Sequence, residues 1–300
     1  MKISKVLLGL SLLLLTTGLW AQKKNVKLPK QLREASGLYM ASPDSLYWIN
    51  DSGDLPQLYL TDANGDVQDI IALPLLNIDW EDLTHDEDGN IYIGDFGNNN
   101  NNRQNLKIYI FHPHRGTLDS IEYAYPDQMA FPPPVADRNF NMEGFFWFRD
   151  SLHLFSKNEV GKGNYYTKHY QIAAQPGQQT AYLRDSLYLK NRVVTAAAMS
   201  PDRRTAALLT YNYGFFLKIF PFSKVSLYVL EDFSDSRFLR SIVREQKIRI
   251  CAPTSQYEAI DFWTNEELLI ASERAKLGYG PKMKRIRLKR DQSSSSTTQP

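Results

Sequence analysis

The chain has very little cysteine and almost no net charge. Cys251 is the single cysteine in 300 residues, so the chain cannot form an internal disulfide or a cysteine-based metal cluster. We expect it to be a small buried residue in a strand. The formal net charge is +2, and the basic residues are spread along the sequence. In the one basic run, 282–290, charged residues alternate with apolar ones as in a half-exposed strand, which argues against a nucleic-acid patch.

Long apolar runs are missing apart from the first 21 residues. There, Lys2 and Lys5 precede an apolar stretch from Val6 to Leu15, and a small residue, Ala21, follows. This order is typical of a secretory signal peptide, and the stretch is shorter than the roughly 20 residues that span a bilayer. We therefore expect residues 1–21 to be a signal peptide and the protein to be exported, periplasmic or extracellular. Residues 291–300 are almost entirely polar, which predicts a disordered tail.

Helical periodicity and known catalytic motifs are also scarce. Only 237–244 suggests a short helix, and neither a Gly-x-Ser-x-Gly elbow nor a phosphate-binding glycine loop occurs. Of the five histidines, we expect only His85 to lie near a functional site. Asp86 to Asn90 resembles part of a calcium loop, but the distal glutamate of an EF-hand is missing. A hairpin turn is therefore the favoured interpretation of this segment.

Short strands bounded by turns dominate the sequence, and one phrase recurs five times. In each copy a small or acidic residue opens an apolar stretch, and a polar residue ends a second stretch further on. The opening residues are Glu34, Glu81, Glu143, Ala196 and Glu258, and their partners are Asp51, Asp95, Lys157, Tyr211 and Glu273. Copies at intervals of roughly 50 residues indicate blades of a propeller or a solenoid.

We predict an all-β fold, a β-propeller of four-stranded antiparallel blades that forms one domain over residues 22–290. Five repeats are visible, and the irregular stretches 111–140 and 171–194 make a sixth blade possible. Residues 25–28 are expected to complete the last blade beside 283–288, which would close the ring and leave no exposed sheet edge.

Equivalent residues of successive blades converge around one axis, which predicts where a ligand binds. The candidates are Glu34, Asp51, Glu81, Asp82, Asp95, Glu143, Lys157, Tyr211, Glu258 and Glu273. Trp80 and Tyr211 are candidates for stacking on a ligand. The asparagine run 98–102 is expected to be a loop at the axis, with a sugar or peptide contact as an alternative.

Several carboxylates cannot all stay ionised at close range without a compensating cation. One interpretation is a bound divalent ion, most simply Ca²⁺ with Glu81, Glu143 and Glu258 as ligands, or a cationic or polyol ligand. The other is architectural: Lys157, Arg103 or Arg274 neutralises the carboxylates, or each glutamate caps backbone amides of a neighbouring blade.

The motifs also resemble a known family. Asn50-Asp51-Ser52-Gly53-Asp54, Asp79-Trp80-Glu81-Asp82, Gly94-Asp95-Phe96-Gly97-Asn98 and Met142-Glu143-Gly144 are similar to secreted bacterial propellers of the TolB-like superfamily. Within it, the groups named for the esterase-like activity of phytase and for SdiA regulation are similar. The resemblance implies the propeller fold and, through the first group's name, a metal-assisted phosphoesterase or related hydrolase.

The sequence does not name a reaction, and enzymatic activity stays undecided. The favoured function is a ligand-binding or protein-interaction module with an acidic central channel. The alternative is the metal-assisted hydrolase, with Glu81 and Glu143 as acid and base. The expected partner is a small ligand or an envelope or extracellular protein, and we expect a monomer that binds no nucleic acid.

Overall fold

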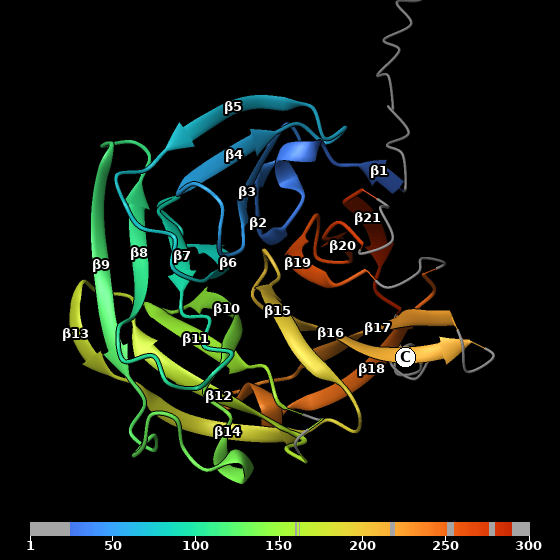
Figure 1. Ribbon diagram of the computed structural model, residues 1–300. Helices are drawn as coiled ribbons and strands as arrows, with labels where there is room; N and C mark the ends of the chain where they lie inside the picture. The colour runs from blue at the N-terminus through green and yellow to red at the C-terminus, as the bar shows by residue number, and fades with distance from the viewer. Residues whose placement is uncertain are drawn as a thin grey trace, which may run out of the picture.

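The computed structural model describes residues 25–159, 161, 163–216, 220–250, 255–275 and 280–289. The predicted signal peptide, Cys251 and the polar tail lie outside these residues. The described chain forms five antiparallel blades of four strands, arranged as a five-bladed β-propeller (Figure 1). No helix in the described ranges is long and apolar enough to cross a membrane.

The blades follow one another along the chain, each with its first strand nearest the axis. Blade 1 contains β2 (Ala35–Ser42), β3 (Ser45–Asn50), β4 (Gln57–Thr61) and β5 (Val67–Ala72). Blade 2 contains β6 (Trp80–His85), β7 (Ile91–Asp95), β8 (Leu106–His112) and β9 (Thr117–Ala124). Blade 3 contains β10 (Met142–Phe148), β11 (Ser151–Ser156), β12 (Tyr166–Ala173) and β14 (Tyr182–Tyr188).

The last two blades complete the ring. Blade 4 contains β15 (Val193–Met199), β16 (Thr205–Phe216), β17 (Phe220–Glu231) and β18 (Ile242–Ile248). Blade 5 contains β19 (Tyr257–Phe262), β20 (Glu267–Ser272), β21 (Lys282–Arg287) and, from the other end of the chain, β1 (Asn25–Lys27). β1 pairs antiparallel with β21, so the predicted closure of the ring is confirmed.

The irregular stretches contain no sixth blade. Residues 111–140 hold the β8–β9 hairpin and a loop with the 3-10 helix η2 (Val135–Asp137). Residues 171–194 hold the end of β12, the strand β13 (Gly177–Thr180) and β14. β13 leaves blade 3 and pairs parallel with β9 on the outside of blade 2. The irregular stretches 111–140 and 171–194 therefore add a loop and a strand to existing blades.

Further short helices are also of the 3-10 type: η1 (Lys30–Leu32) and η4 (Phe238–Arg240). The short helix predicted over 237–244 is confirmed only for residues 238–240, which form η4, because from Ile242 on the chain belongs to β18, the half-exposed outer strand of blade 4. A charged strand with one buried face resembles an amphipathic helix in a short window, and its pairing with β17 decides the structure.

The hydrophobic core lies between the blades. Five clusters of buried side chains occur among the described residues, one at each contact between successive blades. Trp48, Phe145 and Phe146 are fully buried in them, and such large aromatic rings contribute much of the buried apolar area. Every residue of β10 is buried because blades pack on both faces of this inner strand. Inner strands are therefore apolar apart from the few polar residues described next.

Candidate functional site at the propeller axis

Each inner strand starts with a β-bulge at the same place. In all five blades the pairing between the first and second strand skips one residue. The skipped residues are Ser36, Glu81, Glu143, Thr195 and Glu258. All five are buried. A bulge re-aims the side chain that it carries, so these residues are the structurally equivalent positions of the repeat.

This register corrects the repeat alignment made from the sequence. In blade 1 the residue equivalent to Glu81 is Ser36, two positions after Glu34, and in blade 4 it is Thr195. The Glu34 side chain is 42% exposed and pairs with Arg33 at 3.8 Å. Glu34 therefore does not join the glutamates of the other blades, because its repeat position is occupied by a serine.

Ser36 and Thr195 connect neighbouring blades. The Ser36 hydroxyl donates to the Glu81 carbonyl in blade 2, and the Thr195 hydroxyl donates to the Tyr257 carbonyl in blade 5 at 2.7 Å. The short hydroxyl side chains thus fix the register between blades. Glutamate is longer, and at the same bulge position it can reach past the backbone towards other side chains.

The carboxyl group of Asp82 connects blades 2, 3 and 4 near the axis. Its carboxyl accepts hydrogen bonds from the backbone amides of Leu83 at 2.8 Å, Phe145 at 3.0 Å and Ala197 at 3.3 Å. The last two belong to blades 3 and 4, and Asp82 is fully buried. Burial raises the pKa of Asp82 well above its usual range, although these amides oppose the shift. Amide capping, which the sequence suggested for the glutamates, is therefore performed here by the neighbouring aspartate.

Lys157 neutralises part of the acidic group. Its Nζ lies 2.9 Å from Glu143 Oε1 and 3.9 Å from Glu258 Oε1. Gln256 Nε2 bridges Glu258 and Glu273, at 3.2 and 2.9 Å. Burial, followed by the Glu273 charge, raises the pKa of Glu258 well above its usual range. Burial also raises the pKa of Glu143 to about 7 although Lys157 opposes it, so one lysine does not keep both glutamates fully ionised.

Arg103 neutralises Asp95. The guanidinium Nη2 lies 2.9 Å from Asp95 Oδ1, which also accepts the Asp79 backbone amide at 3.1 Å. Arg103 Nη1 donates to the Gly97 carbonyl at 2.7 Å. Asp95 is fully buried. Of the three predicted neutralising residues, Lys157 and Arg103 are thus engaged with carboxylates, but with different ones, whereas Arg274 is exposed.

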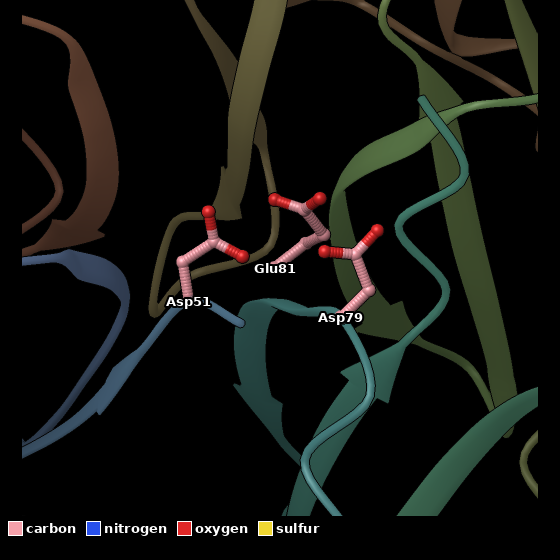
Figure 2. Close-up of side chains that lie close together, drawn as sticks. All are labelled: Asp51, Asp79 and Glu81. Carbon is pink, nitrogen blue, oxygen red and sulfur yellow. The ribbon is translucent and has the colours of Figure 1, made fainter. Parts of the chain in front are cut away.

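Three further carboxyl groups lie together without such a partner. Asp51 follows β3, Asp79 precedes β6, and Glu81 lies in the β6 bulge. Figure 2 shows the three side chains pointing toward one another, and one oxygen from each lies within 4.8 Å of the others. We call this group the carboxyl triad. Glu81 is only 4% exposed, and none of the described residues hydrogen bonds or ion pairs with its carboxyl oxygens.

Without a cation, the triad keeps its protons to higher pH than ordinary carboxyl groups do. Burial, and then the charge of Asp79, raises the pKa of Asp51 to about 7, against the Ser52 amide. Burial, followed by the Glu143 charge, raises the pKa of Glu81 well above its usual range. Burial also raises the pKa of Asp79, although Arg103 and the Ser52 hydroxyl oppose the shift. These acids therefore bind protons that a cation would displace.

Sequence reasoning missed two residues of this site. Asp79 lies outside the repeated phrase, in a bend just before β6, where strand alternation gives no signal for the direction of its side chain. Gly97 was noted only as part of a motif. A Cβ atom at Gly97 would overlap the Glu81 Oε1 and Asp79 carboxyl atoms. The absence of a side chain at Gly97 therefore makes room for the triad.

Tyr211 lines a cavity of about 440 Å³ beside Lys157. Trp80, the other predicted stacking residue, is fully buried and donates its indole N–H to the Leu76 carbonyl at 3.1 Å. Trp80 therefore belongs to the core between blades 1 and 2. In the asparagine run, Asn98 and Asn101 are buried, whereas Asn99 also lines the cavity.

The inner strands of all five blades line a second cavity of about 310 Å³. His85 lies there, stacked on Tyr39 with ring centroids 4.1 Å apart. Asp261 also lines this cavity and accepts the Met40 backbone amide at 2.7 Å. The segment 86–90 is a tight hairpin turn in which Asp86 accepts the amides of Asp88 and Asn90. The predicted hairpin turn is therefore confirmed.

Comparison with known proteins supports the fold. No family model and no curated protein matches the chain. An α-L-arabinofuranosidase from Fusarium graminearum is similar in structure, with a TM-score of 0.51 and 8% identity over 89% of this chain and 98% of the other. An α-L-arabinanase from Penicillium chrysogenum has a TM-score of 0.49 and 9% identity over 88% of this chain and 98% of the other. A gluconolactonase from Xanthomonas campestris has a TM-score of 0.46 and 12% identity over 86% of this chain and 88% of the other. At such low identity the likeness concerns the fold alone.

Proposed function

We propose that this protein is an exported ligand-binding propeller whose acidic axial site holds a divalent cation, with Ca²⁺ as the preferred ion. The observation that carries the proposal is Glu81, a carboxylate that is 4% exposed, faces Asp51 and Asp79, and has no partner among the described residues. Burying an unpaired charge costs several kcal/mol, so a carboxylate in this position either keeps a proton or binds a cation.

The chemistry of the triad suits a hard cation. Ca²⁺ takes oxygen ligands at about 2.3–2.6 Å, so two ligands of one ion lie at most about 5 Å apart. The triad oxygens lie within 4.8 Å of one another. Asp51, Asp79 and Glu81 are therefore the proposed ligands. Of the three ligands proposed from the sequence, Glu81 is kept, while Glu143 and Glu258 are already paired with Lys157.

The resemblance to TolB-like secreted propellers and the predicted signal peptide support an exported protein. Weak Ca²⁺ sites with Kd values near 10⁻⁴–10⁻³ M are typical of extracellular modules. The metal-assisted hydrolase has no supporting observation in the described part of the chain and is not proposed.

Calcium titration of chelator-treated protein tests the proposal. Calorimetry should show one Ca²⁺ site, and saturating Ca²⁺ should raise the melting temperature. Glu81→Gln should weaken binding at least about tenfold, since it removes a charged ligand. Glu122→Gln is the matched control, because Glu122 is exposed and pairs with Lys107 on blade 2. Absence of Ca²⁺ or Mg²⁺ binding up to about 10 mM, well above the extracellular range, or unchanged binding in Glu81→Gln, would overturn the proposal.

A further inference from the structure

The cavity beside Lys157 has the size and place of a binding site. Its volume of about 440 Å³ falls within the roughly 300–1,000 Å³ of small-molecule pockets. It lies where blades 3 and 4 meet the loop after β7, between the end of β11, the start of β15 and the middle of β16. Its charged lining residues are Lys157, Arg192 and Glu159, whose carboxyl group already accepts a hydrogen bond from Asn101 Nδ2 at 2.9 Å. The rest of its polar lining consists mainly of amides: Asn99, Asn141, Asn158, Asn191 and Asn212.

The cations at this cavity are already paired. Lys157 lies 2.9 Å from Glu143, and Arg192 Nη2 lies 2.9 Å from Glu245 Oε1. An anionic ligand would therefore have to compete with a carboxylate on the protein for either charge. A neutral polar ligand needs no such exchange, and it leaves both ion pairs intact.

The amides supply both donors and acceptors. Asn141 donates to Glu143 Oε1 at 2.7 Å and to Asn99 Oδ1 at 3.3 Å, and Asn158 donates to the Arg192 carbonyl at 2.7 Å. These bonds fix two amides in place. The Nδ2 of Asn99 and the side-chain amides of Asn191 and Asn212 make no hydrogen bond to the described residues.

One buried acceptor at the cavity wall is unsatisfied. Asn158 is 1% exposed, and its Oδ1 has no hydrogen-bond partner in the described part of the chain. A buried polar atom without a partner is unfavourable. A hydroxyl group both donates and accepts, as an amide does, so a ligand rich in hydroxyls matches this set.

The cavity also has an apolar side. Val193 and the Tyr211 ring line it next to the amides. A sugar ring combines hydroxyl edges with a face of C–H groups, and an aromatic ring packs well against such a face. We infer that this cavity binds a neutral carbohydrate, a monosaccharide or short oligosaccharide. The inference does not depend on a cation at the carboxyl triad.

A glycan array that carries neutral and acidic saccharides tests this inference. The mature protein should bind neutral saccharides on the array. Calorimetry then measures the Kd for the best neutral saccharide. The double variant Asn99→Ala with Asn212→Ala should raise this Kd at least about tenfold, as expected for loss of two hydrogen bonds. Asn100→Ala is the matched control, because Asn100 is the exposed neighbour of Asn99 and does not line the cavity.

Several outcomes would overturn the inference. Binding to no saccharide, binding to acidic saccharides alone, or equal affinity in the double variant and the wild type would each do so. Circular dichroism and the melting temperature show whether the double variant is folded. If it is not, Asn99→Ala alone serves, since Asn99 is exposed. Saccharide affinity should be the same in chelator and in Ca²⁺, which separates this site from the cation site.

Discussion

At the scale of single residues, equivalent positions in the repeat have different roles. Glu81 and Glu143 occupy the same bulge in blades 2 and 3. Glu143 faces Lys157 at 2.9 Å, whereas Glu81 faces two other acids. The position after the second strand differs between these two blades. In blade 3 it is Lys157, which pairs with Glu143. In blade 2 it is Phe96, and Glu81 instead faces Asp51 at the same position of blade 1. One repeat position thus supplies a structural ion pair and a candidate ligand.

Gly97 offers a test that removes no carboxylate. In Gly97→Ala the new methyl group would overlap the Glu81 and Asp79 carboxyl groups, so both side chains must move. We expect Ca²⁺ affinity to fall about tenfold or more, since ligand geometry sets the affinity of such sites. Calorimetric titration measures this change.

Gly280→Ala is the control for that experiment, since nothing lies within 4 Å of a Cβ atom there. It should bind Ca²⁺ as the wild type does. If Gly97→Ala and Gly280→Ala bind with equal affinity, the triad is not the cation site. Gly97 lacks a positive φ, so alanine there should be tolerated by the backbone.

At the scale of elements, the sequence predicted strands well where turns bound them. In blade 1 the short strand-like stretches between turns form β2, β3, β4 and β5. Their alternating or apolar composition and the Asn and Asp turns between them are local signals. Local signals also identified β1 as the strand that closes the ring.

The bulges and the added strand were not predictable from local signals. A bulge is a shift of one residue between two paired strands, so a single strand carries no sign of it. This is why Glu34 was aligned with Glu81 in place of Ser36. β13 has the sequence Gly-Gln-Gln-Thr, without an apolar pattern, and its pairing with β9 comes from tertiary contact. Asp79 joined the site for the same reason.

Closure of the ring by β1 gives the second prediction. Val26 is 7% exposed and packs in the core between blades 5 and 1, whereas its neighbour Lys27 faces solvent. Val26→Asp places a charge in that core and should lower the free energy of unfolding by at least about 2 kcal/mol. Urea unfolding measures the loss.

Lys27→Asp is the control at the adjacent, exposed position and should change stability by less than about 0.5 kcal/mol. Similar losses in both variants would indicate that β1 contributes no buried side chain to the ring. Loss of β1 pairing also exposes the edge of β21, so Val26→Asp is expected to associate at high concentration. Size-exclusion chromatography would detect this.

At the scale of the whole molecule, buried acids and buried histidines affect stability in opposite directions. The triad and its neighbours carry raised pKa values, including Asp51 and Glu143 at about 7. Elsewhere, His153 and His169 are fully buried in blade 3 and hydrogen bonded to each other at 2.9 Å. Burial lowers the pKa of both histidines. The overall pH profile therefore combines both groups, and a single profile does not report on the axis.

The direction in which the buried acids change stability with pH follows from proton binding. Between about pH 4 and pH 7 the folded state holds protons on Asp51 and Glu143 that the unfolded chain has released, because their folded pKa values are the higher ones. Their contribution to stability thus falls as pH rises through that window and is constant above it. The neutral buried histidines act oppositely: below about pH 6.5 the unfolded chain binds more protons, so they lower stability in acid.

Comparison of the wild type with Asp51→Asn isolates the axial group. Asparagine keeps an acceptor for the Ser52 amide but cannot ionise beside Asp79, Glu143 and Glu258. In chelator, we compare the urea midpoints of the two proteins at each pH. The midpoint of the variant minus that of the wild type should be larger at pH 8 than at pH 5. With saturating Ca²⁺ at pH 8, the wild type should have the higher urea midpoint, because only the wild type gains stability from the bound ion.

The histidines are the same in both proteins, so their contribution cancels in this difference. The gain from Ca²⁺ in the wild type should also grow from pH 5 to pH 8, because the ion must displace protons from the triad. A difference between the two proteins that stays constant with pH in chelator would show that Asp51 does not titrate in this range. The proton-for-cation exchange proposed for the axis would then be wrong.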